Sequence, residues 1–357
     1  MEYYVIYKKK NDHNTAGAKA PADIETLMQI RGAKAILINK YETHDTMIRK
    51  IFGLFINLLN WLKIYRTLQK NSVLLIQHPY YRGFYFLSYF IRRAKAKKNV
   101  KIIVLIHDLE SIREGIEGVI KIKKGKAEKR EKFIISCADS IICHNTCMKN
   151  YLISCGYNSD IIIELEIFDY LYRGSLLDKS TCKESSIAIA GNLAVGKSKY
   201  ISLLPTLGQE LKIHLFGPNY IEEPQVSNII YHGQFKPDEL PQFLEGAFGL
   251  VWDGDTLDTC SGNTGNYLRY NNPHKVSLYL ASGLPVIVWK ESAIAAFIEK
   301  NNLGLTVKSI YDIPQAIQTL TDEQYAIMKK NVTVQGSMLR RGYYFLRAMD
   351  KAVNNLD

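Results

Sequence analysis

Short apolar runs alternate with helix-like patterns along the whole 357-residue chain, and this alternation limits the fold more than any other feature. The runs are largely continuous, as expected for strands that helices cover on both faces. In the first half we expect strands at 3–7, 35–38, 73–76, 102–106, 140–143 and 161–164. In the second half we expect them at 187–190, 212–216, 229–231, 249–252, 286–289 and 305–307. The pattern predicts a doubly wound α/β fold.

The length of the chain predicts two domains, since a domain takes roughly 150 residues. The polar stretch 171–185 breaks the alternation and is expected to be the linker. We therefore expect two Rossmann-like domains, 1–170 and 171–338, that face each other across a cleft. Ligands bind at the carboxyl ends of the strands in such sheets, which places a site in the cleft.

Positive charge is concentrated in the first half. Residues 1–170 hold 28 of the 46 Lys and Arg and 17 of the 35 Asp and Glu, so the whole net charge of +11 falls there. Such a charge indicates an anionic partner. The basic stretch 92–101 follows an aromatic run, and nothing resembles a nucleic-acid module, so we expect a membrane surface or a lipid-linked acceptor and no nucleic acid. The apolar stretch 47–68 could instead belong to the core or to a homo-oligomer interface.

The sequence shows neither a secretion signal nor a membrane span. Its longest apolar stretch, 51–62, falls short of the roughly 20 residues that cross a bilayer. The six cysteines are spaced too irregularly for a disulfide framework, which favours a reducing compartment. We expect a cytoplasmic protein, peripheral at the inner face of the cell membrane if it meets lipid.

The stretch from Gly191 to Ser198 satisfies the phosphate-binding pattern G-x-x-x-x-G-K-[ST] between an expected strand and an expected helix. Backbone N–H groups of such a loop cradle phosphates, and its lysine, Lys197, adds charge. One alternative function is therefore an NTP-dependent phosphotransferase. Because that function leaves the whole first α/β half without a role, we prefer a diphosphate-facing loop that opens the second domain.

A second motif is the pair Asp253-Gly-Asp255, which follows an apolar run. Paired aspartates can hold a divalent metal on a nucleotide diphosphate, because hard cations prefer carboxylate oxygens. This far down the chain, the pair is more simply a polar loop after a strand. We expect no metal and no other cofactor.

The third motif is the most specific. Pro273 precedes an expected helix whose free N–H groups and dipole suit a diphosphate, and Lys275 adds a charge in the first turn. Glu291 follows the next strand, where its carboxylate can accept hydrogen bonds from sugar hydroxyls, and Glu299 can bind a ribose diol. In their order and spacing these residues resemble the nucleotide-sugar half of two-domain (GT-B) glycosyltransferases, including the E-x7-E signature.

The first half resembles one bacterial subgroup of these enzymes. The subgroup contains β-1,6-galactofuranosyltransferases and the glucosyltransferase that extends O-linked GlcNAc on serine-rich-repeat adhesins. The matching stretches are 14–20, 77–79, 106–113, 191–193 and 339–344.

This resemblance implies a UDP-sugar site that needs no metal, with Lys275 and Lys197 stabilising the leaving diphosphate. It also implies that the terminal segment, 339–357, is a helix that crosses back to the first domain. The nucleotide contacts that it implies are Thr15, Gly17, Asn192, Lys197, Pro273, His274, Lys275, Val276 and Ser277.

Asp108 and His107 lie at the end of a central strand, where a general base is needed if the reaction inverts. Asp108 could instead cap the next helix, and His107 could hydrogen-bond the donor sugar. The sequence leaves retention and inversion both open.

The resemblance implies a hexosyltransferase that moves a galactofuranosyl or glucosyl unit from a UDP-sugar to a sugar acceptor in bacterial surface polysaccharide or glycoprotein assembly. Besides the phosphotransferase, a second alternative is a glycosyltransferase-like binding subunit without turnover.

Overall fold

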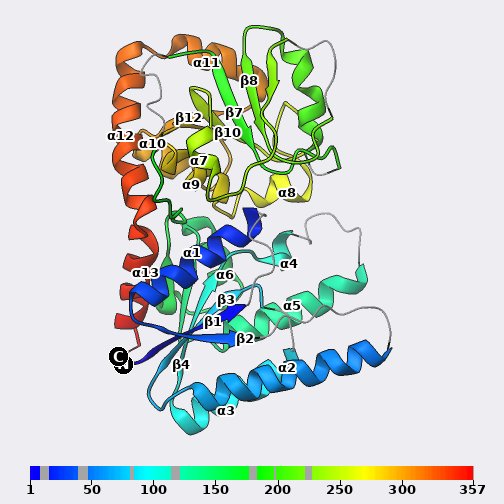
Figure 1. Ribbon diagram of the computed structural model, residues 1–357, viewed down its shortest axis with the longest axis vertical. Helices are drawn as coiled ribbons and strands as arrows, with labels where there is room; N and C mark the ends of the chain where they lie inside the picture. The colour runs from blue at the N-terminus through cyan, green and yellow to red at the C-terminus, as the bar shows by residue number, and fades with distance from the viewer. Residues whose placement is uncertain are drawn as a thin grey trace.

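The computed structural model describes residues 1–8, 16–38, 47–80, 84–113, 121–176, 183–196, 198–221 and 227–356. Within them the chain forms two parallel sheets, each flanked by helices, and Figure 1 shows the two domains one above the other. Every expected strand is present, with its ends shifted by at most two residues.

The first sheet has the strand order β2-β1-β3-β4-β5-β6. Its strands are β1 (Tyr3–Lys8), β2 (Lys34–Ile38), β3 (Val73–His78), β4 (Lys101–Ile106), β5 (Ser140–Cys143) and β6 (Ile162–Glu164). Its helices are α1 (Ala16–Ile30), α2 (Met47–Thr67), α3 (Phe84–Lys98), α4 (Glu110–Arg113), α5 (Lys121–Ser136) and α6 (Thr146–Ser154). The pairing of β3 with β4 sets His78 opposite Ile106, so the chain leaves both strands at the same edge.

The second sheet has the order β12-β11-β10-β7-β8-β9. Its strands are β7 (Ser186–Ala190), β8 (Lys212–Phe216), β9 (Ile229–Tyr231), β10 (Phe248–Val251), β11 (Val286–Trp289) and β12 (Gly304–Val307). Its helices are α7 (Leu240–Phe243), α8 (Gly262–Tyr267), α9 (His274–Ala281), α10 (Ala295–Lys300) and α11 (Ile313–Thr319). This is the order of dinucleotide-binding folds, and it reverses between β7 and β10, where a ligand crevice is expected.

Two terminal helices join the domains. In the second domain α12 (Asp322–Arg340) packs on α9, while α13 (Tyr343–Asn354) packs on β5, β6 and α1 of the first. Gly342 turns the chain between them at φ 79°, and a Cβ at this position would lie 2.1 Å from the Leu27 side chain. In Figure 1 the two helices run down one side of both domains. The expected return of the terminal helix to the first domain is confirmed.

The chain after β6, residues 165–173, connects the two domains and caps α13. The buried Asp169 carboxylate accepts hydrogen bonds from the backbone N–H groups of Tyr344, at 3.2 Å, and Phe345, at 2.7 Å. A negative charge suits a helix N-terminus, although burial raises the pKa of Asp169 to about 7. Two residues further on, Arg347 pairs with Glu166 of the first domain at 2.7 Å.

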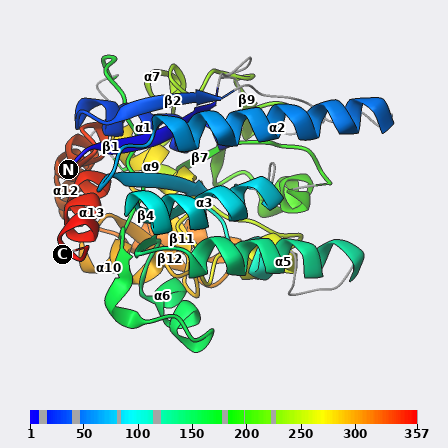
Figure 2. The same cartoon turned by 90° about the horizontal axis from the view of Figure 1, so that it is seen from below.

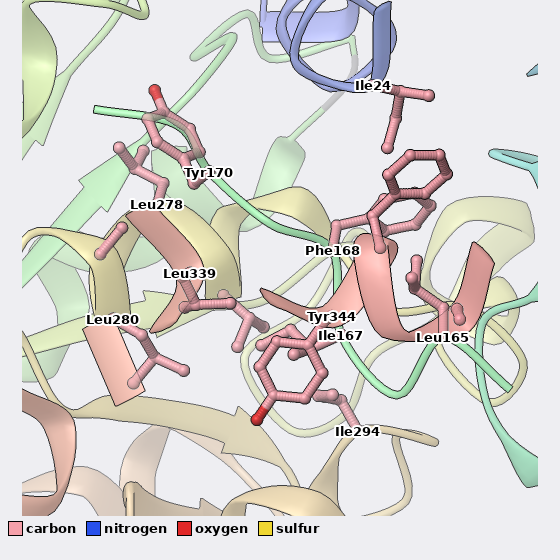
Figure 3. Packing of buried hydrophobic residues seen from close by; sticks show 14 of the residues in the cluster. Ile24, Leu165, Ile167, Phe168, Tyr170, Leu278, Leu280, Ile294, Leu339 and Tyr344 are labelled. Carbon is pink, nitrogen blue, oxygen red and sulfur yellow. The ribbon is translucent and has the colours of Figure 1, made fainter. Parts of the chain in front are cut away.

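One apolar core runs through both domains. Figure 3 shows Phe168 and Tyr170 of the connecting segment close to Ile24 of α1 and Leu278 of α9. The same buried cluster includes residues of both sheets, namely Val5, Leu75, Ile103, Ala188, Val251 and Val286. The two domains are therefore joined by packing as well as by the chain.

Candidate active site at the facing strand ends

Three glycines follow neighbouring strands of the second sheet at their carboxyl ends. Gly191, Gly217 and Gly233 have φ angles of 136°, 148° and 84°, which other residues rarely adopt. The Gly191 N–H donates to the Phe216 carbonyl at 2.9 Å, and the Gly217 N–H donates to the Gly233 carbonyl at 2.8 Å. A Cβ at Gly217 would lie only 1.7 Å from the Gly191 oxygen. These strand ends present bare backbone, which a ligand can approach closely.

The three glycines together form what we call the glycine floor, and the Lys275 side chain lies beside one of them, Gly191. A Cβ at Gly191 would be 3.4 Å from Lys275 Cε, and Lys275 Nζ lies 3.1 Å from Asp253 Oδ1, just beyond β10. The Lys275 and Asp253 side chains are 26% and 23% exposed, so solvent reaches both. α9 also begins without a capping side chain. A positive charge thus lies at the carboxyl ends of β7 and β10, where the strand order predicts a ligand.

The other side chains at the start of α9 face the connecting segment. The His274 ring stacks on Tyr170, with centroids 5.1 Å apart, and its Nε2 lies 3.2 Å from the Asp169 carbonyl oxygen. Burial lowers the pKa of His274 to about 4. Ser277 Oγ donates to the Phe168 carbonyl at 2.6 Å. Val276 and Pro273 are buried as well, so these residues position α9, and Lys275 carries the charge toward the crevice.

Asn192 shapes the turn after β7. Its Oδ1 accepts hydrogen bonds from the Ala194 N–H and from Asn219 Nδ2, both at 3.0 Å. Ser198 is buried, and its hydroxyl donates to the Asn192 carbonyl at 3.2 Å. The stretch that follows, Lys199–Leu207, is a 3-10 helix that contains Pro205. A helix was expected here, and the chain forms a 3-10 helix rather than the α-helix whose N-terminus a P-loop places at the phosphates, so the geometry does not fit a P-loop.

Two of the predicted nucleotide contacts, Thr15 and Lys197, lie outside the described residues. Gly17 is exposed in the first turn of α1, and a Cβ there would meet nothing within 4 Å. Its position leaves room for a ligand but gives no steric reason for glycine.

The pair Asp253 and Asp255 takes part in local contacts. Asp253 holds Lys275, and the backbone N–H of Asp255 lies 3.5 Å from Ser261 Oγ. In the part of the chain that the structure describes, the one group of three possible metal ligands is elsewhere, at His214, His232 and Glu245. Its two imidazole rings hydrogen-bond each other at 2.9 Å.

In the first domain, His107 and Asp108 follow β4. His107 Nε2 donates to Gln77 Oε1 at 2.7 Å, and its ring stacks on Phe168 with centroids 5.3 Å apart. Asp108 Oδ2 lies 3.2 Å from Arg113 Nη1, and the Asp108 side chain is 32% exposed. The next residue, Leu109, donates its N–H to the Tyr267 hydroxyl of the second domain at 2.7 Å. The β4 end is thus held against the second domain, with His107 and Asp108 at the facing edge.

A second polar contact joins the domains at His144. Its Nδ1 accepts the backbone N–H of Asn272 at 2.9 Å, and its Nε2 donates to the Ile106 carbonyl at 3.1 Å. The Asn272 amide donates to the carbonyls of His144, at 2.9 Å, and Glu166, at 2.8 Å. Burial lowers the pKa of His144 to about 4, so its ring is neutral near pH 7. This His144–Asn272 contact fixes the start of α9 against the first sheet.

The two glutamates of the E-x7-E pattern contact residues other than Lys275. Glu291 follows β11, as expected, and pairs with Arg269 at 2.5 Å, while Arg269 lies 4.5 Å from the centre of the Trp289 ring. Glu299 is in the last turn of α10, where its Oε1 accepts a hydrogen bond from Thr306 Oγ1 at 2.7 Å.

Two family models cover most of the chain. Glucosyltransferase 3-like, N-terminal domain, matches residues 2–166, and Glucosyltransferase 3-like, C-terminal domain, matches residues 187–352. The β-1,6-galactofuranosyltransferase WbbI of Escherichia coli K12 is 34% identical over 295 residues, which cover 81% of each chain. The chain belongs to the glucosyltransferase 3-like family.

Further comparisons agree with this assignment. Glucosyltransferase 3 of Streptococcus gordonii is 24% identical to this glucosyltransferase 3-like protein over 284 residues, or 79% of each chain. An Escherichia coli trehalose-6-phosphate structure bound with UDP-2-fluoro glucose has the same fold, with a TM-score of 0.61, 10% identity and 99% of both chains covered. The predicted GT-B fold and the predicted glycosyltransferase group are confirmed.

Several residues that build the site of this glucosyltransferase 3-like protein were missed in the sequence. Gly217 and Gly233 could have been found, because each follows an expected strand by no more than two residues. Asp253 was interpreted as part of a polar loop or, less simply, as a metal ligand, and its contact with Lys275 was not predicted. His144 and Asn272 carry no local signal, since they meet only across the domain boundary.

Proposed function

We propose that this protein transfers a hexosyl unit, galactofuranosyl or glucosyl, from a UDP-sugar to a sugar acceptor in bacterial surface polysaccharide or glycoprotein assembly. The observation that carries the proposal is the position of Lys275 beside Gly191 and Asp253, at the carboxyl ends of β7 and β10. Leu109, the residue after Asp108, is held against the second domain by Tyr267. The names of the relatives support it, since one is a galactofuranosyltransferase and another a glucosyltransferase. The solved structure that shares the fold holds a UDP-sugar analogue.

In this proposal the diphosphate lies over the glycine floor. The acceptor oxygen forms a bond to the anomeric carbon while the bond from that carbon to the phosphate oxygen breaks, and the bonding electrons leave on UDP. Lys275 and the N–H groups at the start of α9 stabilise the developing negative charge. Asp108 takes the proton of the acceptor hydroxyl if the configuration inverts. Arg113 holds the Asp108 carboxylate in place at 3.2 Å.

We also propose that the reaction needs no metal and takes place in the cytoplasm. Asp253 pairs with Lys275 at 3.1 Å. In this proposal the diphosphate takes its place on Lys275, and Asp253 turns to solvent or to a donor hydroxyl. For the compartment, the support is that the cysteines in the described ranges are free thiols, at positions 137, 143, 147, 155 and 260. Reducing compartments keep thiols in this state.

The proposal is tested by ligand stabilisation followed by turnover. UDP and one of UDP-glucose or UDP-galactofuranose should raise the thermal midpoint, whereas ATP should not, because ligands that bind only the folded state stabilise it. Adding a glycan acceptor should then release UDP. Stabilisation by UDP-sugars without UDP release on any acceptor would favour the binding subunit, and stabilisation by ATP with magnesium would favour the phosphotransferase.

A further inference from the structure

The helix α2 is anchored in the first domain along only half of its length. Trp61 and Ile64 are buried in the core, whereas the residues before position 60 expose large apolar side chains. The exposed fractions are 77% for Met47, 81% for Ile48, 61% for Ile51, 52% for Leu54, 55% for Phe55 and 46% for Leu59. In Figures 1 and 2 this half of α2 extends past α3. A contiguous apolar surface of this size marks a place where something docks.

The neighbouring helix α3 adds positive charge to the same side. Neither α2 nor α3 contains an Asp or a Glu. Arg92, Arg93 and Lys97 are exposed and line a shallow hollow of about 460 Å³ on α3. The Arg92 guanidinium lies 5.3 Å from the centre of the Phe133 ring and that of Arg93 5.8 Å from Tyr65, so packed rings support both cations at the surface.

Two other basic residues of α3 serve the fold instead. Lys98 Nζ donates to the carbonyls of Tyr65 and Leu68, both at 2.6 Å. Lys95 Nζ donates to the Cys137 carbonyl at 2.8 Å and to Asp139 at 2.9 Å. The charge that α3 offers to a partner therefore comes from the three residues at the hollow.

α2 and α3 lie on the side of the first domain that is turned away from the second domain (Figure 1). α2 follows β2 and α3 follows β3, so both helices begin at the carboxyl edge of the first sheet. Figure 2 shows α2, α3 and α5 side by side. In the described part of the chain, no helix is long and apolar enough to cross a membrane.

We propose that the apolar half of α2 and the basic hollow of α3 form one surface that docks on an anionic phospholipid membrane. The apolar side chains of residues 47–59 enter the boundary between headgroups and acyl chains, and the hollow receives lipid phosphates. Charge decides between this partner and a second copy of the chain. Because α2 and α3 carry no carboxylate, pairing two copies through this surface would bring positive charge against positive charge.

The test is co-sedimentation of the full chain with phosphatidylcholine vesicles, with and without phosphatidylglycerol. Binding should require phosphatidylglycerol and should weaken as salt is added. Replacing Arg92, Arg93 and Lys97 together by Ser should lower the affinity by roughly 100-fold, at about 1 kcal/mol per basic residue. The matched control replaces three exposed lysines of the second domain, Lys300, Lys308 and Lys330, by Ser and should leave binding unchanged.

A second variant tests the apolar half separately. Replacing Ile48, Ile51 and Phe55 together by Ser should abolish sedimentation at moderate salt, while Ile327→Ser with Val334→Ser, exposed apolar residues of α12, should not. Because all these side chains are exposed, each variant should keep the wild-type thermal midpoint. No donor or acceptor is present, so the result does not depend on the proposed transfer reaction.

Two outcomes would overturn the proposal. The first is absence of binding to phosphatidylglycerol vesicles at low salt, or equal binding of wild type and the basic triple variant. The second is self-association of the wild type in sedimentation velocity that the Ile48, Ile51 and Phe55 variant loses. In that case α2 is an interface between copies of the chain.

Discussion

At the residue scale, the proposed chemistry depends most on Lys275. Lys275→Ala should lower kcat/KM by at least about 100-fold, because a charge-assisted contact to a leaving diphosphate is worth roughly 3 kcal/mol. Steady-state kinetics with a UDP-sugar donor measure the effect. Lys330→Ala, which removes an exposed lysine from α12, is the matched control and should leave the rate unchanged. A Lys275→Ala rate within a few-fold of wild type would show that the crevice is not the donor site.

The stability effects of two glycine substitutions, one in the glycine floor and one in α1, test how closely the site backbone is packed. Gly217→Ala should lower the free energy of unfolding by at least roughly 1–3 kcal/mol, since its Cβ would clash with the Gly191 oxygen at 1.7 Å and its φ is 148°. Gly17→Ala meets no atom within 4 Å and lies in a helix, so stability should stay level or rise by about 0.5–1 kcal/mol. Denaturant unfolding compares them. Equal destabilisation by both changes would contradict the close packing of the glycine floor.

Local chemistry made some site residues predictable and hid others. Lys275 could be placed because Pro273 marks a helix start and a lysine in a first turn is visible in the sequence. The role of Asp253 depends on where α9 lies relative to β10, which no local pattern contains. Glu299 was given a ribose contact from its spacing alone, and in the structure its carboxylate accepts a hydrogen bond from Thr306, so that contact stays a prediction.

At the element scale, the His144–Asn272 contact makes the domain junction sensitive to pH. The pKa of His144 is about 4 in the folded protein and roughly 6.5 in the unfolded chain, so the unfolded chain binds the proton more readily between these values. Stability from this group is complete above pH 6.5 and is lost as the pH falls toward 4. Between pH 7 and 5 the wild type should therefore lose about 2 kcal/mol more than His144→Gln. Parallel pH profiles of the two proteins would refute this.

The cap that Asp169 gives to α13 is a second test at this scale. Asp169→Ala leaves the buried N–H groups of Tyr344 and Phe345 without an acceptor and should lower the free energy of unfolding by about 1–3 kcal/mol. Asp169→Asn keeps an acceptor oxygen and should cost less. Chemical denaturation at pH 8 compares the two variants. If Asp169→Asn proved as damaging as Asp169→Ala, the charge rather than the acceptor would be what α13 requires.

Elements were predictable where the sequence pattern is continuous. The strands are nearly unbroken apolar runs because helices bury both of their faces, and this signal needs no knowledge of tertiary structure. The stretch after Ser198 was expected to be a helix that opens at the phosphate loop, and the chain forms a 3-10 helix there, a difference that no local sequence pattern indicates. The motif matches the P-loop sequence pattern, but the backbone that follows it does not have the P-loop conformation.

At the scale of the whole molecule, the shared core and the terminal helices hold two parallel six-stranded sheets together. The family resemblance gave this architecture, and the structure adds the parts that set the geometry, namely Phe168, Asp169 and Tyr170 packed between α1, α9 and α13. The fold determines neither the donor sugar nor the acceptor, because individual side chains in the site select both.

A diphosphate site at Lys275 that needs no metal can be tested by calorimetric titration in EDTA. Wild type and Lys275→Ala are each titrated with UDP and with uridine. Wild type should bind UDP more tightly than uridine, Lys275→Ala should weaken UDP binding by roughly 100-fold, and uridine binding should not change. Equal UDP affinity in both proteins, or UDP binding by wild type only after magnesium is restored, would contradict it.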